Sequence, residues 1–171
     1  MKQDLRNFLK AAIEGIDIIH ERSKRVQYKD ILSYDEQNSG KRIIISGAPG
    51  CGKTTLSRKI CKDLCSQELT NDYKLVILAH LRELNLYVKE EELQLHHLLK
   101  KYASKRVNIQ LISRTIEETN GKGVILVLDG YDEISDDMKK SQFMQNILKS
   151  SSLYLNECDI IITSRPVTMQ I

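Results

Sequence analysis

The sequence contains no hydrophobic run of the ~20 residues that a membrane-spanning helix needs. Its first ten residues, MKQDLRNFLK, carry charges where a secretory signal peptide needs an apolar core. Internal repeats and low-complexity linkers are also missing. These absences argue against a membrane-spanning, secreted or repeat protein, and we expect a cytoplasmic chain.

Neither the cysteines nor the charge indicates a metal centre or a nucleic-acid partner. Cys61 and Cys65 are one helical turn apart, but no second ligand pair follows at zinc-like spacing, so we expect Cys51, Cys61, Cys65 and Cys158 to be free thiols. The formal net charge is only +3, and the Lys and Arg residues are scattered. A solvated surface explains them better than a patch that binds a phosphate backbone.

The 171 residues, 41% hydrophobic and 29% charged, are typical of one globular domain. Residues 1–40 are expected to form an amphipathic helix and a linker that precede the core at residues 41–171. The apolar residues of the stretch 5–19 recur at helical spacing. Two interpretations stay open for this stripe: it packs on the domain, or it contacts another domain or a partner.

Short apolar stretches alternate with helical ones through the rest of the chain. The strands are predicted at residues 42–46, 73–81, 123–129 and 159–164, and the helices at residues 53–65, 89–103, 107–119 and 138–148. This alternation predicts an α/β fold with a parallel sheet. Because the strands are apolar almost throughout, both faces of the sheet should be covered.

The segment GAPGCGKTT, which follows the first predicted strand, matches the phosphate-binding pattern G-x-x-x-x-G-K-S/T, known as Walker A. Glycines let successive backbone N–H groups face an anion, and the following helix adds its positive end. The lysine can reach the β- and γ-phosphates, and the first threonine can bind Mg²⁺. The predicted nucleotide-binding residues are Gly47, Ala48, Pro49, Gly50, Cys51, Gly52, Lys53, Thr54 and Thr55.

Three acids lie at and just after the end of the third predicted strand, in the segment VLDGYDE, a Walker B pattern. Asp129 ends the strand, and parallel strands end at one edge of a sheet, so Asp129 should bind Mg²⁺ together with Thr54. Asp132 and Glu133 are the predicted catalytic acids that act on water. The alternative, an acidic helix start in DEISDD, explains Asp136 and Asp137 but not Asp129.

The fourth predicted strand ends in TSRP, which places Arg165 at the same edge. Its planar guanidinium suits a γ-phosphate, so we assign Arg165 to phosphate sensing. A surface arginine before a proline is the alternative interpretation.

The three segments GAPGCGKTTL, VLDGYDE and ITSRP, in this order, resemble the NACHT family. These proteins are signal-transduction NTPases of the STAND group, within the AAA+-like P-loop proteins, and they include the NOD-like immune receptors. The resemblance covers roughly residues 41–170. Its most telling feature is the small Gly130 directly after Asp129, with Asp132 and Glu133 further along the chain. The segment LRELN at residues 81–85 also looks like an arginine-containing segment of the family.

The resemblance implies a three-layer P-loop NTPase sandwich and a role in innate-immune-type signalling. Bound ATP and Mg²⁺ would act as a switch, with slow hydrolysis. Lys53 would contact phosphates, Glu133 with Asp132 would orient the attacking water, and Arg165 would occupy the sensor-1 position.

ATP is favoured over GTP because the sequence has no guanine-reading motif. The implied partners are other domains of a longer protein and a nucleotide-dependent homo-oligomer. A turnover ATPase of the AAA+ remodelling type and a small-molecule phosphotransferase are the alternatives.

The chain departs from the family pattern at its end. The family continues with a fifth strand, a helical lid and a winged helix, so the resemblance implies a NACHT core truncated after the sensor-1 strand. In the sheet order of the family, the fifth strand flanks the first. We therefore expect residues 42–46 to form an exposed edge strand.

Overall fold

The computed structural model describes residues 30–32, 40–66, 72–87, 99–100, 108–149 and 155–166. The chain divides into two compact units, Met1–Glu36 and Gln37–Ile171. Only residues 30–32 of the first unit are described, so the helical stripe predicted at residues 5–19 lies outside the described residues. The predicted helix at residues 89–103 also lies outside them, except for residues 99–100. The strands and α-helices of the described residues all belong to the second unit.

The described part of the second unit contains a parallel sheet with the strand order β1-β4-β3-β2. Its strands are β1 (Arg42–Ser46), β2 (Leu75–His80), β3 (Val124–Asp129) and β4 (Asp159–Ser164). Every neighbouring pair in this order runs parallel. The strands predicted at residues 42–46 and 159–164 are confirmed with the predicted bounds, and the other two begin one or two residues later than predicted.

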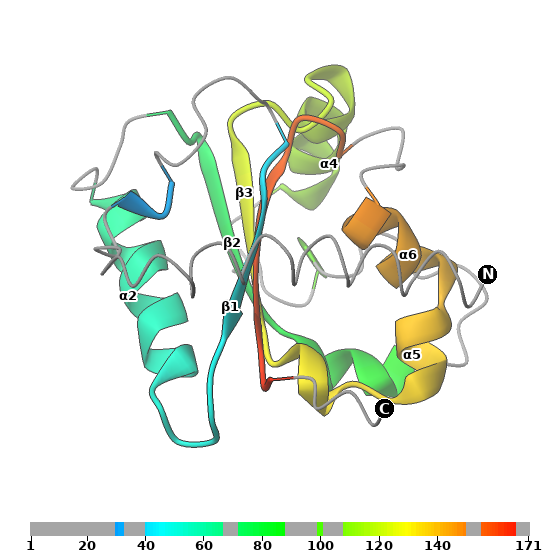
Figure 1. Ribbon diagram of the computed structural model, residues 1–171. Helices are drawn as coiled ribbons and strands as arrows, with labels where there is room; N and C mark the ends of the chain where they lie inside the picture. The colour runs from blue at the N-terminus through cyan, green and yellow to red at the C-terminus, as the bar shows by residue number, and fades with distance from the viewer. Residues whose placement is uncertain are drawn as a thin grey trace. The chain divides into compact units, whose positions relative to one another are not determined.

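Helices cover both faces of this sheet, which confirms the predicted three-layer α/β sandwich. They are α2 (Lys53–Cys65), α4 (Ile109–Glu118), α5 (Asp136–Lys140) and α6 (Gln142–Lys149). Figure 1 shows α2 on one face and α4, α5 and α6 on the other. Two 3₁₀ segments, η2 (Leu81–Tyr87) and η3 (Tyr131–Glu133), follow β2 and β3.

The single helix predicted at residues 138–148 is wrong, because α5 and α6 are separated by Ser141. The backbone of Ser141 leaves the helical region, with φ −59° and ψ 147°. The Ser141 hydroxyl donates to the carbonyl oxygen of Met138 at 2.7 Å and accepts from the N–H of Met144 at 3.3 Å. One side chain therefore closes the first helix and opens the second.

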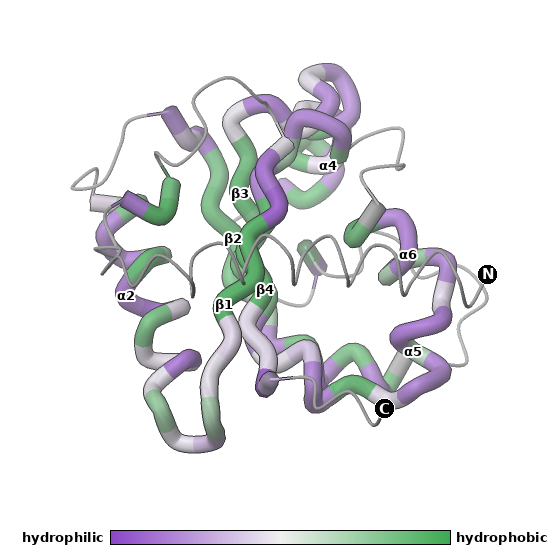
Figure 2. The backbone as a smooth tube through the Cα atoms, in the orientation of Figure 1, coloured by the Kyte–Doolittle hydropathy of each residue, from purple (hydrophilic) through white to green (hydrophobic). Residues whose placement is uncertain are grey.

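The hydrophobic core is centred on the two inner strands, β3 and β4. All six residues of β3 are buried, as are five of the six in β4. Figure 2 shows the same distribution as hydrophobic colour concentrated in the strands. Burial on both faces of the sheet explains why these strands do not alternate between apolar and polar residues.

β1 lies at the edge of the sheet and, among the described residues, pairs with β4 alone. The edge position predicted for residues 42–46 is thus confirmed for the described part of the chain. Its residues Arg42–Ile45 are half-buried and Ser46 is exposed, in contrast to the buried inner strands.

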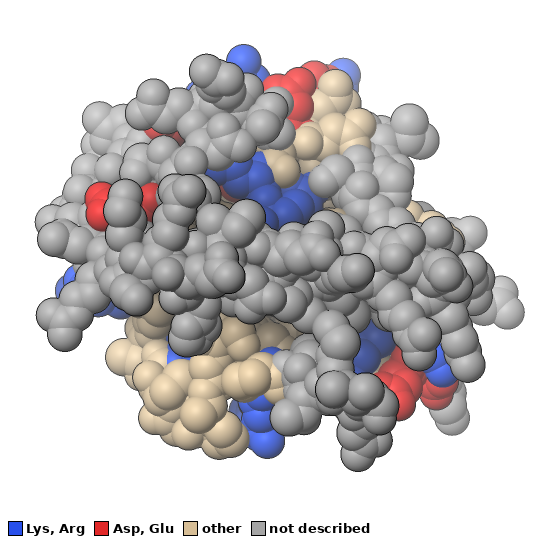
Figure 3. Space-filling view, viewed as in Figure 1, with Lys and Arg blue, Asp and Glu red and all other residues tan. Residues whose placement is uncertain are grey.

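Charges of both signs lie interspersed among the described residues on the face shown in Figure 3. In the described part of the chain, no helix is both long enough and apolar enough to span a membrane.

Candidate functional site

The loop between β1 and α2 carries the predicted phosphate-binding residues. Its first amide, Gly47 N–H, donates to the carbonyl oxygen of Ser164 at 3.1 Å and so ties the loop to the end of β4. Gly52 stands immediately before α2 with φ 94°, a left-handed conformation that glycine adopts without strain. Residues 48–52 are exposed. The loop and the start of α2 thus lie at the carboxyl edge of the sheet, where the first N–H groups of a helix can face an anion.

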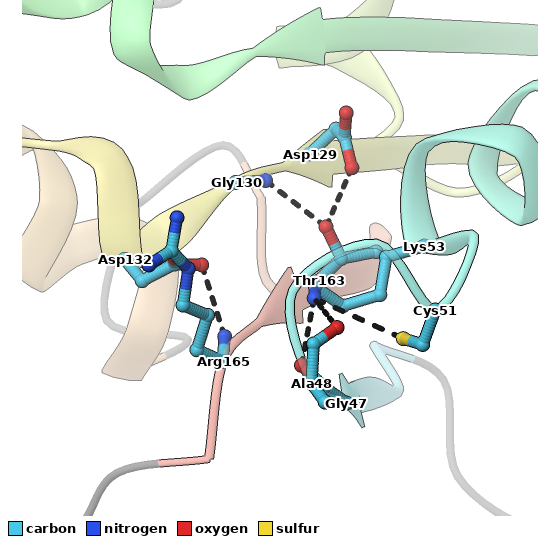
Figure 4. Close-up of polar contacts among 9 residues, drawn as sticks. All are labelled: Gly47, Ala48, Cys51, Lys53, Asp129, Gly130, Asp132, Thr163 and Arg165. Atoms are coloured by element: carbon cyan, nitrogen blue, oxygen red, sulfur yellow. Dashed lines mark hydrogen bonds and ion pairs between the residues drawn. The ribbon is translucent and has the colours of Figure 1, made fainter.

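The Lys53 ammonium group lies against this loop. Its Nζ donates to the carbonyl oxygens of Gly47 at 2.7 Å and Ala48 at 3.0 Å, and lies 4.0 Å from Cys51 Sγ (Figure 4). Lys53 is the first residue of α2, and Thr54 and Thr55 follow it as exposed residues. The positive charge therefore sits at the point where the loop meets the helix.

Asp129, the last residue of β3, is 6% exposed and surrounded by hydrogen-bond donors. Its Oδ1 accepts from Thr163 Oγ1 at 2.6 Å and from Ser57 Oγ at 3.4 Å, and its Oδ2 lies 3.2 Å from His80 Nδ1. Burial by itself raises the pKa of Asp129, but hydrogen bonds from Thr163, Thr54 and His80 outweigh it and leave the pKa lowered. Asp129 is therefore an ionised carboxylate at neutral pH.

Thr54 contributes to the lowered pKa of Asp129, so the two residues predicted to bind Mg²⁺ interact across the loop and the strand end. Hydroxyl and carboxylate oxygens are the ligands that Mg²⁺ prefers, usually with one or two protein groups and the phosphates of a nucleotide. The described residues contain no group of three or more His, Cys, Asp or Glu side chains that would hold a metal alone. A hydroxyl and a carboxylate fit a Mg²⁺ ion that a nucleotide also holds.

Thr163 joins β4 to the end of β3. Its hydroxyl donates to Asp129 and accepts from the N–H of Gly130 at 3.0 Å, and the residue is fully buried. Gly130 has φ 85°, and an added Cβ would lie 3.3 Å from Glu133 Cδ. The chain thus turns sharply after Asp129, and the left-handed backbone with the nearby Glu133 explains a glycine at this position.

The two predicted catalytic acids have different surroundings. Asp132 is paired with Arg165, whose backbone N–H donates to Oδ1 at 2.9 Å and whose Nε lies 2.7 Å from Oδ2 (Figure 4). The Asp132 side chain is 19% exposed and that of Arg165 is 55% exposed. Glu133 is exposed on the same 3₁₀ turn. The structure therefore brings Arg165 to Asp132, and distinguishes this acid from Glu133.

The sequence prediction assigned no role to His80, Ser57 or Asn85. His80 ends β2 and pairs in register with Asp129. Asp129 is predicted because it is a polar residue at the carboxyl end of an apolar strand, and the same rule applies to His80. Ser57 lies one helical turn after Lys53 and is buried. Asn85 lies in η2 and has no comparable signal in a single sequence.

The comparison with protein families agrees with this geometry. Residues 41–171 match the family model of the NACHT domain. This chain belongs to the NACHT family. A comparison with curated proteins gives no significant match.

As a NACHT domain, the chain is a P-loop NTPase that binds a nucleotide together with Mg²⁺. The resemblance drawn from its three motifs is confirmed. The NACHT match concerns the domain as a whole, so the functions of Lys53, Glu133 and Arg165 stay predictions.

Proposed function

We propose that this NACHT domain binds ATP and Mg²⁺, hydrolyses ATP slowly, and serves as the nucleotide switch of an innate-immune-type signalling protein. The observation that carries the proposal is the contact between α2 and the end of β3, where Ser57 Oγ donates to Asp129 Oδ1 at 3.4 Å and Thr54 helps to lower the pKa of Asp129. It joins the phosphate loop and the acidic strand end at one edge of the sheet. No further protein ligand is needed if the phosphates of the nucleotide supply the remaining ligands of Mg²⁺.

Each residue has a distinct task in this proposal. The loop residues 47–55 hold the phosphates through backbone N–H groups, and Lys53 adds a positive charge. Thr54 and Asp129 hold Mg²⁺, which neutralises the negative charge of the phosphates when it is bound. Glu133 orients water, and Arg165 contacts the γ-phosphate.

The pairing of Asp132 with Arg165 supports slow hydrolysis and a switch. Arg165 has to leave a partner at 2.7 Å before its guanidinium reaches a phosphate. A nucleotide shifts an equilibrium only if it binds two arrangements with different affinities. An arginine with two competing anionic partners supplies such a difference within this domain.

The setting and partners follow from the same proposal. All four cysteines are free, which agrees with the reducing cytoplasm. ATP is proposed rather than GTP because the sequence has no guanine-reading motif. Other domains of a longer protein and a nucleotide-dependent homo-oligomer are the proposed partners.

Thermal unfolding with and without nucleotide tests the proposal. Saturation with ATP and Mg²⁺ at a hundredfold Kd should add about 2.7 kcal/mol to the free energy of unfolding. For a domain of this size, the melting temperature should rise by about 5–10 °C.

The Lys53→Ala variant should lose the shift, and chelation of Mg²⁺ should reduce it. Lys62→Ala is the matched control, because Lys62 is an exposed lysine in the last turn of the same helix. A folded wild-type chain whose melting temperature does not respond to any nucleotide would contradict the proposed function.

A further inference from the structure

Two segments far apart in the sequence meet beside the acids through the side chain of Asn85. Asn85 lies in η2, shortly after β2. Its Nδ2 donates to the carbonyl oxygen of Glu133 at 3.1 Å, and its Oδ1 accepts from the N–H of Ser135 at 2.8 Å. One side chain therefore makes two backbone hydrogen bonds, across sequence separations of 48 and 50 residues.

The two partners determine the orientation of the Asn85 amide. A backbone N–H can only donate and a carbonyl oxygen can only accept, so Oδ1 must face Ser135 and Nδ2 must face Glu133. Rotating the amide by half a turn would break both bonds. Aspartate and leucine, which are close to asparagine in size, each lack at least one of these functions.

Buried neighbours place Asn85 where it can make this contact. Leu84 is 1% exposed and Ile134, between the two contacted residues, is 3% exposed. The segments η2 and η3 are in contact. The hydrophobic core thus brings the segments together, while the amide fixes their register.

The turn that carries the acids is short and needs support at both ends. Its own backbone bond runs from the N–H of Glu133 to the carbonyl oxygen of Gly130 at 3.0 Å. Thr163 holds the first end through the N–H of Gly130. Asn85 holds the second end, immediately after the acids.

We propose that Asn85 is a positioning residue of the nucleotide site, which fixes the turn that carries Asp132 and Glu133. The inference rests on the proposed function, because it assigns Glu133 to the attacking water. Asn85 acts only through the turn and touches neither nucleotide nor Mg²⁺. Its loss should leave nucleotide affinity intact and lower the rate of hydrolysis.

Hydrogen exchange of the Ser135 amide in the 171-residue chain tests the contact without nucleotide. Asn85→Ala should accelerate this exchange about tenfold, which corresponds to about 1.4 kcal/mol. Asn85→Asp keeps the acceptor for this amide and should retain most of the protection. Leu86→Ala is the control, because Leu86 is adjacent and 80% exposed. Unchanged exchange in Asn85→Ala would overturn the proposal.

Single-turnover hydrolysis, measured beside the ATP dissociation constant, tests the positioning role. Asn85→Ala should reduce the rate about tenfold or more and change the dissociation constant less than twofold. In a Glu133→Gln background, the same substitution should have no further effect on the rate, because the group that it positions is already lost. General destabilisation would instead weaken binding and lower the rate in both backgrounds.

The outcomes separate the two proposals. A wild-type chain that binds no nucleotide would overturn the proposed function and, with it, the positioning role of Asn85. A wild-type chain that binds and hydrolyses ATP, with an Asn85→Ala variant of unchanged rate, would overturn the positioning role alone.

Discussion

At the residue scale, the site depends on a few buried hydroxyl groups that determine how Asp129 is held. Thr163 is the clearest case, because its hydroxyl has a donor on one side and an acceptor on the other. Since the Gly130 N–H donates to it, the hydroxyl proton must point at Asp129. This arrangement favours the ionised carboxylate and orients it, as a metal ligand requires.

Replacing Thr163 by valine keeps the shape of the side chain and removes both hydrogen bonds. We expect Thr163→Val to lower the free energy of unfolding by about 2–3 kcal/mol, because a buried carboxylate loses its shortest hydrogen bond and a buried N–H loses its acceptor. Thr163→Ser retains the hydroxyl and should cost only about 1 kcal/mol for the lost methyl group. Urea unfolding measures both values, and an equal loss in the two variants would show that the hydroxyl contributes nothing.

Asp132 and Arg165 provide a second prediction at this scale. In the proposed switch, Asp132 competes with the γ-phosphate for the guanidinium. Asp132→Asn should therefore tighten ATP binding, but only about two- to fivefold, because a pair this exposed is worth less than about 1 kcal/mol.

Calorimetric titration of ATP and ADP checks this expectation. ADP lacks the γ-phosphate, so its affinity should not change. Arg165→Ala provides the control, since Asp132→Asn should have no effect on affinity once the arginine is absent. Weaker ATP binding in Asp132→Asn would instead mean that Asp132 itself supports the nucleotide.

At the scale of elements, Arg42 joins the edge strand to the rest of the domain. Its guanidinium donates to backbone carbonyl oxygens of Gly40, Lys41, Ile147, Leu155 and Cys158. These carbonyls belong to the two residues before β1, to α6 and to the segment before β4. Burial lowers the pKa of Arg42, which shows that the charge is partly removed from water.

A lysine at position 42 keeps the charge but cannot reach carbonyls on three segments at once. We expect Arg42→Lys to lower the free energy of unfolding by about 1–3 kcal/mol. The matched control is Arg114→Lys, because Arg114 is 76% exposed and makes one ion pair, with Glu118. That control should change stability by less than about 0.5 kcal/mol. A similar loss in both variants would contradict the role given to Arg42.

The elements also show how far a single sequence can predict a fold. The bounds of β1, α2 and β4 are predictable, because an apolar run or a glycine signal marks each of them. The break between α5 and α6 is not, since it depends on two hydrogen bonds of the Ser141 hydroxyl that leave no trace in the hydrophobic pattern. Similarly, the sequence of η2 has no hydrophobic periodicity that would predict a 3₁₀ segment there.

For the site, the sequence predicts the residues at the carboxyl ends of strands but not the contacts between them. The rule for parallel strands places Asp129 and Arg165 on one edge. It does not show that Arg165 pairs with Asp132, because this contact depends on how the turn after Gly130 is directed. Asn85 escapes prediction for the same reason, since its partners are backbone groups of another segment.

At the scale of the whole molecule, the environment of Asp129 should appear in the dependence of stability on pH. The pKa of Asp129 is lowered in the folded chain, so the unfolded chain binds its proton at a higher pH than the folded chain does. The contribution of this residue to stability is therefore fully present above the unfolded pKa of about 3.9. It is lost as the pH falls from there through the folded value.

Comparing the wild type with Asp129→Asn isolates this contribution from the other carboxyl groups, which are common to both chains. Below about pH 5, the wild type should lose stability more steeply than Asp129→Asn as the pH falls through the folded pKa of Asp129, by at most about 1.4 kcal/mol per pH unit for the one proton involved. Urea unfolding at a series of pH values measures both curves. If the two curves ran parallel throughout the acidic range, the hydrogen bonds from Thr163, Thr54 and His80 would not be stabilising the ionised carboxylate.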